Sequence, residues 1–97
     1  MRHREAVAKI RYHLIKAGLT CSAIDRQYGL YAHQAQDAIF EPNEAGERAI
    51  AAALHMEPKE LWPHRFDTKT GKRLTPQPRS NYRPRRTARQ RQKAAAA

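Results

Sequence analysis

Apolar residues recur at helical spacing in short stretches of the chain, and glycine or proline residues separate these stretches. From residue 5 to residue 17 the apolar side chains follow one stripe: Ala6, Ile10, Leu14 and Ala17, widened by Val7 and Ile15. Because residues three or four apart lie on the same helix face, this spacing predicts a first helix. Gly18 follows it as a C-terminal cap, where glycine adopts a left-handed backbone without steric cost.

The next two stretches predict a pair of short helices with a tight connection. Thr20 is suited to cap a helix over residues 21–28, with Ile24 and Tyr28 on its inner face. Gly29 ends this helix, and a third helix is expected over residues 32–40 after a turn of three or four residues. Its inward side chains are Ala35, Ala38 and Ile39.

Two further helices are expected before residue 67. Pro42 and Asn43 end the third helix and cap a fourth, from residue 44 to about residue 55, with Ile50, Ala53 and Leu54 inside. Its acids Glu44 and Glu47 lie in the first turn, where the helix dipole favours negative charge. Pro58 begins a short helix that ends before Pro63. We assign Trp62 and Phe66 to the core.

No segment alternates between apolar and polar residues as a half-buried strand does, so the sequence predicts an all-α fold. We expect a compact bundle of about five short helices over residues 3–67. A domain of this size buries only about 60% of the surface of its unfolded chain. Its stability therefore depends on close packing between the helices.

Charge divides the chain of 97 residues at about residue 67. All nine Asp and Glu lie before that point, where nine of the 19 Lys and Arg match them, so the formal net charge of +10 belongs to residues 68–97. This C-terminal part has few apolar residues and several prolines. Such a composition cannot bury enough surface to offset its ordering entropy, so we expect residues 68–97 to form a disordered basic tail. Its charge favours a polyanionic partner.

Residues 21–40 follow the helix, glycine, turn and helix order of a helix-turn-helix. The segments "LTCSAIDRQYG", "GERAIAAAL" and "PKELWPHRF" go further, and the stretch Leu19 to Phe66 resembles the Ner family of DNA-binding regulators of Mu-like phages. This resemblance implies a lambda-repressor-like fold. Asp25 departs from it, since a small residue is usual at that position. An acid there could cap the backbone locally or face solvent.

The resemblance implies that the third helix lies in the major groove of DNA, with residues near its N-terminus at the base edges. The side chains expected to contact bases are Tyr31, Ala32, His33, Gln34, Gln36 and Asp37. Gln can form two hydrogen bonds to adenine, and each such pair discriminates by about 1–3 kcal/mol. The alternative is that these residues form only the solvated face of a short helix.

Phosphate contacts are expected from arginines that flank this face and from the basic tail. The candidates are Arg26, Arg48, Arg65, Arg79, Arg83, Arg85, Arg86, Arg89 and Arg91. Arg11 and Lys16 are further candidates for the DNA backbone. Cations of the tail could instead enter a narrow minor groove or bind structured RNA.

Other chemistry has little support in the sequence. The five histidines show no paired spacing and the single cysteine has no thiol partner, so we expect no metal site, no cofactor and no enzymatic activity. We also expect no small-molecule ligand. No run of 18 apolar residues could span a membrane, no signal peptide is evident, and the tail lacks bulky apolar residues for a membrane surface. We therefore expect a location in the bacterial cytoplasm or nucleoid, including that of a phage-infected or prophage-bearing host.

The function that these features favour is sequence-specific binding of double-stranded DNA by a transcriptional regulator, a repressor of phage or mobile-element genes. One short helix-turn-helix contacts few base pairs, so a second copy is expected to pair with the first on DNA. Two alternatives stay open. One is an architectural DNA- or RNA-binding protein that acts through the tail, and the other is a protein-interaction module of a transposition or repair complex.

Overall fold

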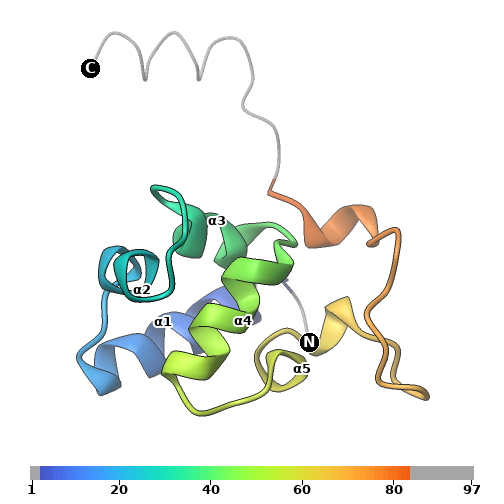
Figure 1. The fold of residues 1–97 in the computed structure, drawn as a ribbon. Coiled ribbons are helices and arrows are strands. Elements are labelled where there is room, and N and C mark those ends of the chain that lie inside the picture. Colours follow the sequence, from blue (N-terminus) through green and yellow to red (C-terminus); the bar gives the residue numbers. More distant parts are fainter. Residues whose placement is uncertain (1–2, 84–97) are drawn as a thin grey trace, which may run out of the picture.

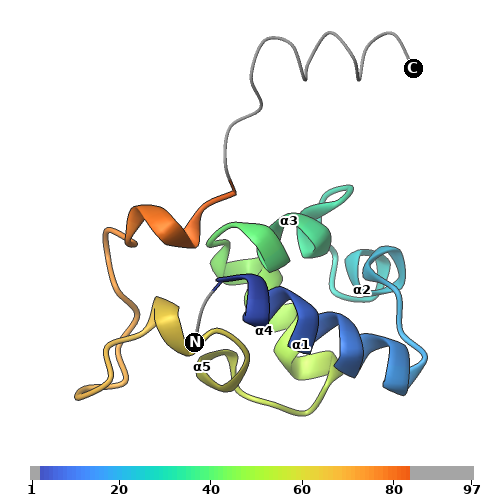
Figure 2. The ribbon, with the colours of Figure 1, turned by 180° about the vertical axis from the view of Figure 1, so that it is seen from behind.

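The structure, a computed structural model, describes residues 3–83. In this part of the chain the regular elements are α1 (His3–Ala17), α2 (Cys21–Gln27), α3 (Gln34–Phe40), α4 (Glu44–Ala53) and α5 (Pro58–Leu61), followed by short 3-10 turns at Pro63–Arg65 and Arg79–Asn81. Figures 1 and 2 show α2 and α3 side by side, and α3 packs against both α1 and α4. The all-α bundle of five short helices expected from the sequence is confirmed.

The core lies where the apolar stripes of these helices meet. Its fully or almost fully buried side chains include Ile10 and Leu14 of α1, Ile24 of α2, Ile39 of α3, Ile50 of α4, and Leu61 and Trp62. These positions, apart from Leu61, follow from the helical spacing of the sequence and from the assignment of Trp62 to the core. Three residues expected to face inward lie at the surface instead: Ile15 is 78% exposed, Tyr28 is 38% exposed, and Ala17 is also exposed. Phe66, also assigned to the core, is half-buried and lies outside the core cluster.

Helix ends follow the capping residues that the sequence offers. The Thr20 side chain accepts a hydrogen bond from the Ala23 N–H (3.1 Å), and the Asn43 side chain accepts one from the Gly46 N–H (2.9 Å). Each of these bonds satisfies a backbone N–H that has no partner within its helix. The expected N-caps of α2 and α4 are therefore confirmed.

The closest approach of α3 to α4 occurs at Gly46. A Cβ atom on Gly46 would lie 2.6 Å from the Cβ of Ala38 and 3.0 Å from the carbonyl oxygen of Gln34. Both of those atoms belong to α3 and have no freedom to rotate away. The missing side chain at Gly46 thus sets the distance between the two helices.

Gly46→Ala should destabilise the domain, although helix propensity alone predicts the opposite sign. Alanine is better than glycine in a helix by about 1 kcal/mol. Overpacking against an immobile neighbour costs about 1–3 kcal/mol, so the expected net effect is a lower free energy of unfolding. Urea unfolding followed by circular dichroism measures the sign directly. A more stable variant would contradict the tight α3–α4 contact.

The segment that follows residue 67 differs from the expected disordered tail. Residues 68–83 fold back on the bundle, and a single antiparallel bridge between Phe66 and Arg73 closes a short hairpin. We name residues 67–83 the C-terminal strap. Arg73, Asn81 and Arg83 tie it to the bundle through hydrogen bonds and ion pairs, and the hydrophobic pattern gives no sign of such contacts. Residues 84–97, the rest of the expected tail, lie outside the described residues.

Candidate nucleic-acid interface

The turn between α2 and α3 is held by the side chain of Asp25. Its two carboxylate oxygens accept hydrogen bonds from the His33 N–H (3.0 Å) and the Ala35 N–H (2.9 Å), at the start of α3. Asp25 is only 8% exposed. Of the two roles left open by the sequence, local capping is therefore the one that the structure shows. The acid occupies the crossing of the two helices and fixes the first turn of α3.

Backbone conformation completes this turn. Gly29 has a φ of 67° and His33, the residue before α3, has the same φ of 67°. Glycine adopts this left-handed region without steric cost, whereas histidine is uncommon there. The His33 side chain makes no capping hydrogen bond to α3. The Asp25 carboxylate takes that role, because it accepts from the backbone N–H groups at the start of the helix. The His33 ring is left free to project from the surface.

Most of the residues expected to contact bases are exposed and lie at or near the start of α3. Tyr31 is 57% exposed, Ala32 and His33 are exposed just before α3, and Gln36 is exposed one turn further along. Asp37 is half-buried. We name Tyr31, Ala32, His33, Gln36 and Asp37 the α3 face.

Gln34, expected to contact bases, has a different role. It is 8% exposed, its Oε1 accepts from the Tyr31 N–H (3.1 Å), and its Nε2 donates to Asn43 Oδ1 (3.0 Å). Asn43 in turn donates from Nδ2 to the Tyr31 hydroxyl (3.1 Å). Both the oxygen and the nitrogen of the Gln34 side-chain amide are thus hydrogen-bonded within the protein. Gln34 therefore organises the α3 face and is not part of it.

Arg65, expected to contact phosphate, is buried. It is 0% exposed, and its guanidinium donates to the carbonyl oxygens of Ala38 (2.8 Å) and Ile39 (3.3 Å) at the end of α3. It also pairs with Glu47 at 3.2 Å and lies over the Trp62 ring. Burial lowers the pKa of Arg65 to about 10, which leaves it charged at neutral pH. Because DNA cannot reach it, the prediction for Arg65 is wrong.

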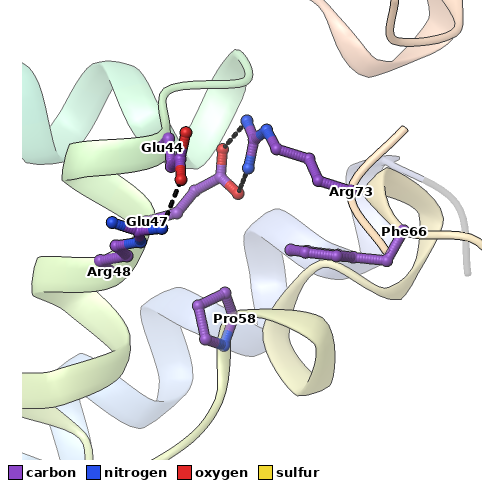
Figure 3. Close-up of a pocket in the computed structure, with 6 residues that line it drawn as sticks. All are labelled: Glu44, Glu47, Arg48, Pro58, Phe66 and Arg73. Carbon is purple, nitrogen blue, oxygen red and sulfur yellow. Dashed lines mark hydrogen bonds and ion pairs between the residues drawn. The ribbon is translucent and has the colours of Figure 1, made fainter. Parts of the chain in front are cut away.

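Glu47 joins this buried arginine to the C-terminal strap. Arg73 donates to both Glu47 oxygens at 2.7 Å, a two-point contact that Figure 3 shows beside Phe66 and Pro58. Glu47 Oε2 also accepts from the Asn43 N–H (2.7 Å). Hydrogen bonding to Glu47 raises the pKa of Arg73. The sequence places Glu47 in the first turn of its helix but gives no sign that two arginines converge on it.

The remaining arginines expected to contact phosphate lie at the surface. Arg26 is exposed on α2 and Arg79 is exposed on the strap. Arg48 is exposed on α4 and pairs with Glu44 at 2.5 Å, also visible in Figure 3. Arg83 pairs with Asp37 and Glu41 of α3. The others, Arg85, Arg86, Arg89 and Arg91, lie outside the described residues.

Catalytic and metal chemistry find no further support among residues 3–83. No group of three or more His, Cys, Asp or Glu in this part of the chain could hold a metal ion. Burial raises the pKa of the Cys21 thiol, and the nearby Asp25 carboxylate adds to that rise. A thiol with a raised pKa is a poor nucleophile near neutral pH. No helix within the described part of the chain is long and apolar enough to cross a membrane.

A short α2, a capped turn and an exposed face on α3 define a helix-turn-helix DNA-binding domain. A family model described as winged helix-turn-helix DNA-binding matches residues 6–78. The match spans well over half of the chain, so the protein belongs to this family. It also includes the hairpin of residues 66–73 and so extends past the domain boundary expected at residue 67. Searches of curated proteins and of solved structures each give no match.

Proposed function

We propose that the protein is a sequence-specific DNA-binding transcriptional regulator, a repressor of phage or mobile-element genes of the Ner type. In this proposal α3 enters the major groove and the α3 face contacts base edges. The observation that carries it is the contrast around α3. Asp25, Gln34 and Asn43 fix the backbone from inside, while Tyr31, His33 and Gln36 stay exposed. A rigid helix with exposed hydrogen-bonding side chains suits recognition of bases.

The surface arginines have a supporting part in the proposal. Arg26, Arg48 and Arg79, together with the arginines beyond Arg83, are proposed to bind phosphates without regard to sequence. If about six cations neutralise phosphates, the logarithm of the binding constant should fall with the logarithm of salt concentration at a slope near −5. Occupation of an operator would block polymerase, and this mechanism requires no cofactor.

A random-duplex binding selection on the full chain tests this function. Enrichment of one motif, with RNA of matched length competing poorly, would support a sequence-specific regulator. Retention of duplexes without any motif, or stronger retention of RNA, would contradict it and favour an architectural or RNA-binding protein. Failure to retain any duplex would favour a protein-interaction module instead.

We further propose that two copies bind together on the operator, because the single seven-residue α3 reaches few base pairs. Sedimentation of the complex with the shortest high-affinity duplex measures the stoichiometry. Two copies on a duplex with two half-sites are expected. A single copy with full affinity and full specificity would contradict the pairing.

A further inference from the structure

The C-terminal strap is tied to the bundle at successive points along its length. At its start the hairpin is closed by hydrogen bonds from the Leu74 N–H to the Arg65 carbonyl (3.0 Å) and from the Asp67 N–H to the Lys72 carbonyl (2.8 Å). Further along, Asn81 is only 2% exposed and donates to the His64 carbonyl (3.0 Å) and to Gln77 Oε1 (2.8 Å). The path of the strap is therefore defined as far as Asn81.

Two residues beyond Asn81, the strap reaches the recognition helix itself. Arg83 donates from Nε to Glu41 (3.2 Å) and from Nη2 to Asp37 (3.3 Å), and its guanidinium lies 5.6 Å from the centre of the Phe40 ring. Figures 1 and 2 both show the orange end of the strap beside α3. One side chain thus bridges two acids that are one helical turn apart, at the C-terminal end of α3.

These two acids present an electrostatic problem for a helix that lies on DNA. Asp37 belongs to the α3 face, and Glu41 follows it by four residues. Their side chains remain 37% and 41% exposed, so both carboxylates face solvent and would repel nearby phosphates. Glu41 is not among the residues proposed to contact bases, so the α3 face does not offset its charge. Some other group has to offset it before this end of α3 can approach DNA closely.

Two cations from distant parts of the chain converge there. Arg83 comes from the strap, and Arg11 of α1 lies 5.4 Å from the centre of the same Phe40 ring. With both arginines present, the formal charge around Phe40 balances that of Asp37 and Glu41. Removal of Arg83 would take these ion pairs from both Asp37 and Glu41.

We propose that Arg83 is a positioning residue of the DNA interface, which neutralises and holds Asp37 and Glu41 so that the C-terminal half of α3 can lie against the phosphate backbone. The inference rests on the proposed function and adds to it, since the C-terminal strap would then take part in DNA binding. The partner is duplex DNA. Arg83 increases DNA affinity by neutralising Asp37 and Glu41, and it makes no phosphate contact of its own.

A double-mutant cycle on the full chain separates these two routes. The variants are Arg83→Gln, the pair Asp37→Asn with Glu41→Gln, and all three changes together. Binding is measured by fluorescence anisotropy on the duplex enriched by the wild-type chain and on a random-sequence duplex pool. At low salt, Arg83→Gln should weaken binding by about tenfold when both acids are present. It should weaken binding by less than about threefold when both acids are neutral.

Lys69→Gln is the matched control, because Lys69 is an exposed cation of the same strap to which no part in binding is assigned. It should alter binding less than Arg83→Gln does. The thermal midpoint of Arg83→Gln should stay near that of the wild type, since exposed ion pairs contribute little to folding. Equal losses in both backgrounds would overturn the inference, because Arg83 would then act directly on DNA. Unchanged binding would overturn it too. If the wild-type chain binds neither duplex, the proposed function itself fails.

Discussion

Glu47→Ala is expected to lower the free energy of unfolding by about 3–5 kcal/mol, most of the stability that a domain this small has. The Glu47 side chain is 1% exposed and forms ion pairs with both Arg65 and Arg73. Its removal leaves the Arg65 guanidinium buried without a counter-ion. A buried charge without a partner is among the most costly defects in a protein interior.

Glu44→Ala is the control for this prediction. Glu44 lies on the same helix and also pairs with an arginine, but the side chains of Glu44 and Arg48 are 56% and 73% exposed. An exposed pair contributes about 1 kcal/mol or less. Urea unfolding of both variants, followed by far-ultraviolet circular dichroism, compares the two sites. Equal shifts of the unfolding midpoint would contradict the buried network around Glu47.

Asp25→Ala should have the second largest effect, and it should reduce both stability and DNA binding. The change removes the acceptor of two backbone N–H groups, those of His33 and Ala35. Leaving such donors unsatisfied costs about 2–3 kcal/mol, because bonds to a charged acceptor are stronger than neutral ones. The loss falls on the first turn of α3, so the α3 face should lose its fixed geometry.

Ser22→Ala provides the comparison on the same helix, since Ser22 is exposed and exposed substitutions usually change stability by less than about 0.5 kcal/mol. Urea unfolding and duplex binding are measured for both variants, at a temperature where each is folded. Asp25→Ala should be the less stable variant and the weaker binder. If it matches Ser22→Ala in both measurements, Asp25 does not hold the recognition helix.

The helices and most of the core could be predicted from the sequence, because their signals are local. Thr20, Gly29 and Asn43 mark helix ends through capping and backbone chemistry that involve only near neighbours. The exposed position of Gln36 likewise follows from helical spacing. Helical spacing can be recognised without knowing which other element packs against the helix. For that reason the five helices end within about two residues of the expected positions.

The polar interior could not be predicted, because it depends on pairs of residues far apart in the chain. Arg65 and Glu47 look like surface charges in the sequence, and only the packing of α3, α4 and the strap brings them together. Gln34 is a polar residue at the start of α3, and the sequence does not show that its side chain binds Asn43, nine residues further along. The strap was missed for the same reason, since Arg73 and Asn81 bind through polar groups that leave no apolar pattern.

The central claim, that α3 recognises DNA bases, is tested most directly by Gln36→Ala. Its binding and that of the wild type are compared on the enriched duplex and on every single-base-pair variant of that site. We predict that the variant loses about 1–3 kcal/mol of discrimination at one or two positions and keeps its preferences elsewhere. Its affinity for random duplex and its salt dependence should stay unchanged. Unaltered preferences at every position, or an equal loss on all sequences, would contradict the account.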